Sequence, residues 1–318
     1  MDFLFRKRIF PILLAAALVV FFAGFAYTGI EDNIKKSFTV NPGGTLTLDT
    51  DIGSISVEGV KGNKVEVEVL REARTDSEKK AEEIFDNFEI DFSQKGDDVN
   101  ITADYERDGW SWFEKNVGKY LRVKFIISVP QSYNLKLKTS GGGIEVNDLE
   151  GEINCKTSGG SLSFDNVIGP VWGRTSGGSV RVGEVDGNID VHTSGGSIKI
   201  ERAKGDINAH TSGGGITVEE VMGTIQADTS GGSIKAYISK QPQANCRLTT
   251  SGGSITAYLA ENINVFLDAR TSGGSIHTEF PITLKGKIDK SALKAKINDG
   301  GPELYLRTSG GSIYIRKK

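Results

Sequence analysis

Apolar residues recur with a fixed rhythm from position 142 onward. A glycine stands every nine residues between Gly142 and Gly232. The apolar residues that follow it fall two, four and seven positions later in one nonamer, and two and four positions later in the next. Alternating apolar positions are typical of short strands with one buried face. Because the two nonamers differ, the pattern predicts an 18-residue coil that contains two unlike strands.

The tetrapeptide Thr-Ser-Gly-Gly separates successive coils. It starts at Thr139, Thr157, Thr175, Thr193, Thr211, Thr229, Thr250, Thr271 and Thr308, and the first six copies are 18 residues apart. A fixed period of this size marks a solenoid, whose repeats bury their apolar residues only by stacking on one another. We therefore expect an all-β fold, a single-stranded parallel β-solenoid of two sheets whose coils rise by about 4.8 Å each.

The corner residues suggest how the chain turns. Glycine can supply a positive φ, and Thr or Ser can bond the local backbone. The same hydroxyls would stack into a row along one edge of the solenoid. That row is either plain turn chemistry or a flat array that orders water, as in ice-binding solenoids.

The regions on either side of the regular coils are less uniform. Residues 37–138 alternate with a weaker period and form an expected N-terminal β region, whereas 139–318 hold the repeats and a C-terminal cap. The sequence Thr50–Val57 looks like a degenerate corner, so a first coil is conceivable there. Between Thr271 and Thr308 the gap widens to 37 residues, which we expect to hold a degenerate coil.

One segment, 75–88, has a helical period instead. Its apolar stripe consists of Ala81, Ile84, Phe85 and Phe88. Thr75 or Ser77 can cap it, and Glu78 stands three residues after Thr75 as in a capping box. We expect a short amphipathic helix that packs over an end or a side of the sheets; a helix that docks on another surface is the alternative.

The first 36 residues read as a targeting segment. They comprise a basic stretch at 1–8, an uncharged and mostly apolar run at 9–26, and a polar tether at 27–36. The positive flank predicts a cytoplasmic N-terminus. The run is barely long enough to span a bilayer, so we expect a single-pass membrane anchor with an extracytoplasmic C-terminal domain. A cleaved signal peptide, with a weak site at Gly24–Ala26 and a secreted or periplasmic product, is the alternative.

Composition narrows the classes of function. The chain has 318 residues, 40 of them Gly and only 7 Pro, and its net charge is −3. Strictly periodic glycine without proline argues against a disordered linker, and the mixed charges predict no nucleic-acid partner. Cys155 and Cys246 are too few for a disulfide framework. Five coils separate them, about 24 Å at strand spacing, so we expect no bond between them.

Two residue sets could carry chemistry, although the sequence assigns no catalytic, cofactor-binding or metal-binding residue. His192 and His210 occupy the same outward position one coil apart, and Asp190 or Asp206 could complete a metal site. A solvated polar column is the simpler interpretation of the histidines, because the ligand count is thin. The corners have Thr-Ser where calcium-binding rolls have an Asp ladder, so no calcium is expected.

The second set is a column of outward carboxylates, Asp165, Glu201 and Glu219. Paired carboxylates can cleave glycans, which gives the alternative of a polysaccharide-acting enzyme on a β-helix scaffold. A solvated face neutralised by Arg181, Lys199 and Lys235 is the simpler interpretation. Separately, the aromatic run Trp110–Phe113 is either a core plug or an exposed contact for a membrane or glycan.

A family resemblance rests on the entry into the repeats and on their end. The runs Ile126–Pro130 and Asn134–Gly142 lead into coils of the form Gly-x-Ile-x-Val, and Leu304–Ile313 repeats the theme. Residues 40–316 resemble the bacterial putative-adhesin family, β-strand-repeat domains without established catalytic residues. The resemblance implies export, membrane anchoring and a link to envelope stress. It favours a non-enzymatic envelope protein without a cofactor. The expected partner is an unknown extracytoplasmic protein or glycan. A module that assembles end to end through its open sheet edges is a further alternative.

Overall fold

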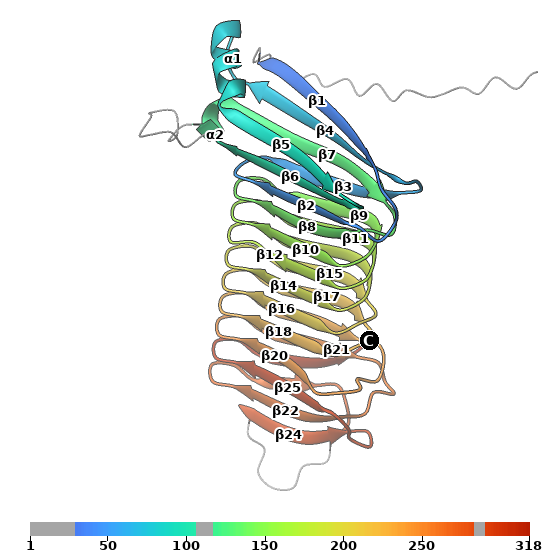
Figure 1. The fold of residues 1–318 in the computed structure, drawn as a ribbon. Helices are drawn as coiled ribbons and strands as arrows, with labels where there is room; N and C mark the ends of the chain where they lie inside the picture. The colour runs from blue at the N-terminus through green and yellow to red at the C-terminus, as the bar shows by residue number, and fades with distance from the viewer. Residues whose placement is uncertain (1–28, 106–116, 283–289) are drawn as a thin grey trace, which may run out of the picture.

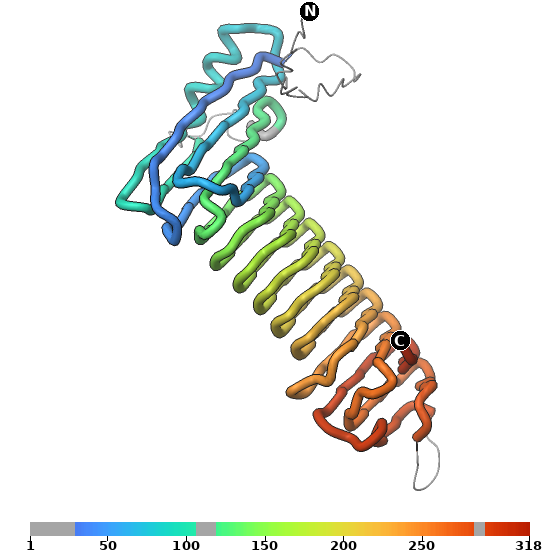
Figure 2. The backbone as a smooth tube through the Cα atoms, turned by 90° about the vertical axis from the view of Figure 1, so that its right-hand side faces the viewer, coloured from blue at the N-terminus to red at the C-terminus, as the bar shows by residue number. Residues whose placement is uncertain are grey.

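The computed structural model describes residues 29–105, 117–282 and 290–318. Two sheets of 13 strands run side by side along the molecule, and their strands stack like rungs (Figures 1 and 2). The strands pair in parallel wherever coils stack, and antiparallel pairs occur only toward the two ends of the described chain. The predicted all-β solenoid with two parallel sheets is therefore confirmed.

The spatial order of the strands defines the two sheets. Sheet A contains β1 (Ile30–Thr39), β4 (Lys64–Ala73), β7 (Leu121–Pro130), β3 (Ser54–Val60), β9 (Ile144–Glu150), β11 (Leu162–Ile168), β13 (Val180–Asp186), β15 (Ile198–Ala203), β17 (Ile216–Val221), β19 (Ile234–Ile238), β21 (Ile255–Leu259), β26 (Ile313–Lys317) and β23 (Ile276–Thr278). Sheet B contains β24 (Ala292–Ile297), β22 (Val265–Thr271), β25 (Glu303–Thr308), β20 (Cys246–Thr250), β18 (Ile225–Thr229), β16 (Ile207–Thr211), β14 (Ile189–Thr193), β12 (Val171–Arg174), β10 (Ile153–Thr157), β8 (Asn134–Thr139), β2 (Thr45–Thr50), β6 (Asp98–Tyr105) and β5 (Phe88–Lys95).

Apolar ladders between the two sheets form the core. Ile198, Ile216 and Ile234 pair in register across β15, β17 and β19 and are at most 1% exposed. Every such position repeats after one coil, so each side chain packs on its equivalent in the next coil. Cys155 and Cys246 also point inward from β10 and β20, five strands apart in sheet B, and both are free thiols.

The corner threonines are buried in the described structure. Thr193 donates its hydroxyl to the carbonyl of Gly178 at 2.6 Å and accepts the amide of Gly196 at 3.3 Å, and the equivalent threonines repeat this pattern. All nine are at most 6% exposed. The predicted local hydrogen bonding is thus present. The exposed threonine array for ordered water is wrong, because these hydroxyls face the interior and join adjacent coils.

The corner glycines allow the backbones of adjacent coils to approach each other closely. None of the glycines in the nine described Thr-Ser-Gly-Gly corners has a positive φ, so that expectation is wrong. A Cβ on Gly160 would instead lie 2.1 Å from the carbonyl oxygen of Gly142, and one on Gly178 would lie 2.1 Å from that of Gly160. Stacked coils therefore require a residue without a side chain at this position.

In the coils of β9 and β11, a left-handed residue precedes the third apolar position of the nonamer that forms sheet A. Asp148 and Asn166 have φ of 56° and 55°, and the Asn166 amide donates to the Asp148 carboxylate at 2.7 Å. The local turn brings the next residue back to the interior, so Leu149 and Val167 are buried. Asn and Asp tolerate this conformation better than other residues with side chains.

At the N-terminal end, the first coil is made by β2 and β3. These strands pair with β8 and β9 in parallel, which confirms that Thr50–Val57 is a corner. Helix α1 (Glu78–Asp86) begins after Ser77, whose hydroxyl accepts the Lys80 amide, and it lies at the end of the molecule (Figure 1). Ala81 and Ile84 are buried. A single helical turn, α2 (Val117–Tyr120), precedes β7.

The C-terminal end departs from sequential stacking. Strands β25 and β26, the last in the chain, insert between the coil of β20–β21 and that of β22–β23. The residues between Thr271 and Thr308 do not form the expected degenerate coil, because β24 pairs antiparallel with the outer edge of β22 and closes sheet B. The coil of β22 and β23 therefore lies farther along the stack than the coil of β25 and β26, although it comes earlier in the sequence.

Some predictions concern residues outside the described part. This group consists of the basic segment 1–8, the anchor at 9–26, the first two residues of the tether at 27–36, and Trp110–Phe113. Residues 30–36 of the predicted tether belong to β1 and are paired with β4. Within the described ranges, no helix combines the length and the apolar character needed to cross a membrane.

Candidate functional site

The predicted histidine column is present on the outer face of sheet B. Lys156, Arg174, His192, His210 and Asp228 are paired in register on successive strands. The two imidazole rings stack with centroids 4.5 Å apart. Partial burial, the neighbouring His210 and the Arg174 guanidinium together lower the pKa of His192. This side chain therefore favours its neutral form.

The proposed third metal ligands have other partners. Asp190 receives two hydrogen bonds of 2.9 Å from Arg174, and the Asp206 carboxylate accepts both the amide and the hydroxyl of Thr224 at 2.8 Å. Within the described ranges, no cluster of three His, Cys, Asp or Glu residues is arranged to hold a metal ion. The structure places the histidines together but does not bring them into a ligand set.

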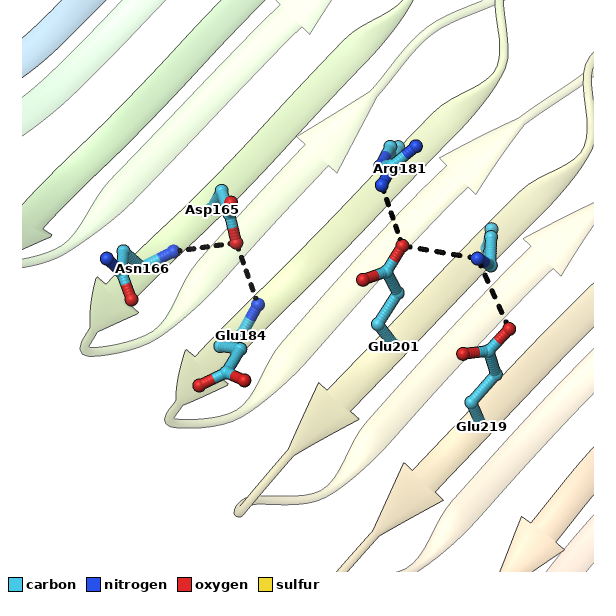
Figure 3. Close-up of polar contacts among 7 residues, drawn as sticks. Asp165, Asn166, Arg181, Glu184, Glu201 and Glu219 are labelled. Carbon is cyan, nitrogen blue, oxygen red and sulfur yellow. Dashed lines mark hydrogen bonds and ion pairs between the residues drawn. The ribbon is translucent and has the colours of Figure 1, made fainter.

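The outward carboxylates of sheet A form an ion-pair chain. Arg181 donates to Glu201 at 2.8 Å, and Lys199 bridges Glu201 and Glu219 at 3.2 Å each (Figure 3). Both carboxylates raise the pKa of Lys199, which keeps the bridging ammonium charged. Alternating charges of this kind are typical of a structural surface network.

Asp165 is separate from that chain. Its carboxylate accepts the backbone amides of Asn166 and Glu184 at 3.1 Å each (Figure 3). It also fills the space that a side chain at Gly183 would need, since a Cβ there would overlap the Asp165 carboxylate. The three predicted carboxylates therefore do not converge on one point where a glycosidic bond could lie between an acid and a base.

A groove of about 460 Å³ crosses the outer face of sheet B. One column lining it consists of Trp172, Asp190, Asn208 and Gln226, which occupy the same position in four successive coils. A second column at the adjacent turn consists of Pro170, Asn188, Asp206 and Thr224. Glu152 precedes Pro170 in this second column. This groove is a row of polar groups that begins at one partly exposed tryptophan.

Trp172 is held in place by its neighbours. The Arg174 guanidinium lies 4.6 Å from the centre of the indole, within cation–π range. The same guanidinium is fixed by its two hydrogen bonds to Asp190, and Asn208 donates to Asp190 at 3.2 Å. The arrangement orders four side chains over three strands without a catalytic pair among them.

The outer face of sheet A has an aromatic region near β26. Tyr237 and Tyr258 stack with centroids 4.4 Å apart, and His277 stacks on Tyr314 at 5.1 Å. The Arg316 guanidinium lies 5.3 Å from the centre of the Tyr314 ring. Each ring thus covers one face of its partner.

A larger depression, of about 840 Å³, lies where β1, β4 and β7 meet the first corner. Two ion pairs lie among its lining residues: Asp32 with Arg71 at 2.5 Å, and Glu72 with Arg122 at 3.6 Å. Arg71 also donates to the carbonyl of Phe85 in α1. The contacts of Arg71 join the helix to the sheet, and the charges at this depression therefore serve structural pairing.

Comparison with known proteins identifies the family. The profile of the Toastrack DUF4097 family matches residues 45–316. The chain belongs to this family. No curated protein sequence matches the chain.

Solved structures with a related arrangement cover 90% of this chain. They include a putative adhesin from Parabacteroides merdae (14% identity, TM-score 0.37, 96% of that chain) and a putative adhesin from Bacteroides fragilis (13%, 0.35, 97%). A putative lipid binding protein from Parabacteroides distasonis is similar at the same level (14%, 0.36, 97%). The names of these structures differ, and sequence identities and TM-scores at this level do not indicate a function.

The groove of this Toastrack chain was missed by sequence reasoning. Trp172 follows Gly169 by three positions, which is an outward position in the nonamer with two apolar residues, the one that forms sheet B. A large aromatic residue on an outward, solvent-facing column is the signal that could have found it. The prediction of aromatic contacts relied instead on Trp110–Phe113, which lies outside the described residues.

Proposed function

We propose that the chain is a non-enzymatic, membrane-tethered envelope protein whose solenoid serves as an adhesin-like contact surface for an extracytoplasmic protein or glycan. One observation carries the proposal: the buried threonine and glycine corners join every coil to the next by side-chain and backbone contacts. Such a framework fixes the outward residues in straight columns. Repeat proteins with this property use extended surfaces for binding.

The tether gives the proposal an orientation. A membrane anchor at residues 9–26 would join the described chain at β1, whose first residue, Ile30, lies at the same end as α1 (Figure 1). Each sheet has 13 strands, and twelve spacings of about 4.8 Å make it roughly 58 Å long. The contact surface would then extend away from the bilayer, with β24 at the distal end.

A reporter fusion tests the location. An enzyme that is active only outside the cytoplasm, fused after residue 40, should give signal in intact cells. The same reporter fused to a chain in which Arg6, Lys7 and Arg8 are all replaced by Glu serves as the control, because the positive flank determines orientation. An inactive wild-type fusion would contradict export.

A binding comparison tests the contact function against the enzyme alternative. The full-length protein is incubated with envelope fractions, and both its retention and the release of soluble sugar product are measured for wild type, for Glu201→Gln and for a chain that lacks residues 160–195. A contact surface spread over coils should lose retention only in the deletion. A glycan-cleaving enzyme should instead lose product formation by orders of magnitude in the carboxylate variant.

A further inference from the structure

We propose that the groove beginning at Trp172 on sheet B binds a neutral glycan chain. This inference specifies the ligand class of the contact surface proposed above and rests on it. It starts from the column of Trp172, Asp190, Asn208 and Gln226, one residue from each of four successive coils. At strand spacing, the column covers roughly 14 Å, which is enough for several sugar rings in a row.

Trp172 supplies the platform for one ring. Sugars present a face of C–H groups, and an indole offers a large, rigid apolar surface with its polar atom at the edge. The indole is partly exposed and lines the groove, and Arg174 covers it from one side at 4.6 Å. Because Arg174 is itself anchored by Asp190, the platform loses little conformational freedom when a ligand binds.

The remaining column supplies paired donors and acceptors. A side-chain amide both donates and accepts, which matches a sugar hydroxyl, and a carboxylate accepts with two oxygens. Asn208 uses one N–H on Asp190, and Gln226 is exposed at the next step. Asn188 and Asp206 repeat the same chemistry along the adjacent turn, where the Asn188 oxygen accepts the Asp206 amide at 2.9 Å. The groove thus offers polar groups at intervals of one coil.

The charge of the groove selects among polymers. Its lining contains three carboxylates, on Glu152, Asp190 and Asp206, and no Lys, Arg or His. Arg174, beside the groove, offsets only the charge of Asp190. An acidic polysaccharide or a phosphate-rich chain would meet repulsion here. A basic peptide is the other ligand that such a lining attracts, but it would not need the tryptophan platform.

The test uses the full-length protein and defined oligosaccharides. Tetramers of β-linked glucose and of N-acetylglucosamine are the neutral probes, a galacturonate tetramer is the acidic probe, and tetralysine is the basic probe. Binding is followed by ligand-observed NMR up to about 10 mM, because isolated sugar sites bind weakly. We expect at least one neutral tetramer to bind, with little change when the salt concentration rises from 50 to 500 mM, since no ligand charge is screened.

Substitutions then locate the site. Trp172→Ala should weaken neutral-tetramer binding by about tenfold or more, since buried tryptophan contacts dominate many interfaces. Gln226→Glu and Gln226→Lys should weaken it to a similar extent, because a neutral ligand loses the amide in both. Tyr237→Ala, which removes a stacked aromatic residue of sheet A, is the matched control and should leave affinity unchanged.

Three outcomes would overturn the inference. They are no binding of any neutral tetramer, salt-sensitive binding of tetralysine alone, and equal losses in Trp172→Ala and Tyr237→Ala. None of these results touches the broader contact function, which fails separately if the 160–195 deletion keeps full retention on envelope fractions.

Discussion

The second glycine of each corner is the position that tolerates substitution least, because adjacent coils leave no space there for a side chain. At Gly160 the carbonyl of the preceding coil occupies the place of a side chain, whereas the adjacent Gly159 has ordinary contact distances of 3.5 Å or more. Both glycines look identical in the sequence motif. Their different constraints arise only when coils stack, which explains why the motif predicts a corner but not its physical cause.

This difference gives a matched pair of substitutions. Gly160→Ala should destabilise the protein by about 1–3 kcal/mol, because an added methyl must displace the backbone of the neighbouring coil. Gly159→Ala should change stability by no more than about 0.5 kcal/mol. Urea denaturation followed by circular dichroism measures both. Equal effects of the two changes would contradict the close approach as the reason for glycine.

His192 makes stability depend on pH in a predictable direction. Its folded-state pKa is lowered from the ordinary value of 6.5, so the unfolded chain binds the proton more readily. The stabilisation by neutral His192 is therefore complete above about pH 6.5, and it is lost as the pH falls toward the folded-state pKa. We expect the urea midpoint of His192→Gln to fall less than that of wild type when the pH is lowered from 7.5 to 5.0.

The control for this prediction lies on the other sheet. Thr217, an outward residue of sheet A, provides it: Thr217→Gln neither adds nor removes a titratable group, so the pH dependence should stay as it is in wild type. A larger acid-induced loss in His192→Gln than in wild type would show that the histidine is stabilised as a cation, which the sign of the pKa shift forbids.

At the scale of the strand, the alternation of faces is the part of the fold that the sequence specified best. Positions two and four after each glycine are inward in every regular coil, and the period of two leaves no other choice once one face is buried. The insertion of β25 and β26 between earlier coils could not be foreseen in the same way. Their residues follow the same repeat pattern as all other coils, and that pattern does not encode which neighbour each coil selects.

Adjacent positions in β17 test the alternation directly. Ile216 is fully buried, and its neighbour Thr217 faces outward between Lys199 and Lys235 in the sheet register. Ile216→Asp should cost several kcal/mol or prevent folding of the central coils, because an unpaired charge would be buried. Thr217→Asp should stay within about 0.5 kcal/mol of wild type.

Thermal or urea unfolding of the two variants is the measurement. Because both changes introduce the same side chain into the same strand one residue apart, a general effect of negative charge or of lower strand propensity would appear in both. A comparable loss in the two variants would show that the inward register described for sheet A is wrong.

For the whole molecule, the repeat restricts which lengths can be removed. Deleting residues 160–195 takes out two complete coils and joins Gly159 to Gly196, which stands at the same corner position as Gly160. The coil of β9 and β10 would then stack on that of β15 and β16, with Ile144 against Ile198 and Ile153 against Ile207. Stability in a solenoid is the sum of repeat and neighbour contacts, so the shortened chain should fold. Small-angle scattering should show a particle shorter by about 10 Å, two coil spacings.

The decisive comparison is a deletion of 27 residues, 160–186. It is also a multiple of the nine-residue glycine period, and it removes less of the chain. It nevertheless joins two sheet-B nonamers in succession, so a strand shaped for sheet B would occupy a place in sheet A, where a third buried apolar residue such as Leu149 or Val167 is required. We therefore expect the 36-residue deletion to retain cooperative unfolding and the 27-residue deletion to lose it. If both shortened proteins fold equally well, the 18-residue coil is not the structural unit, and the nonamer is the unit instead.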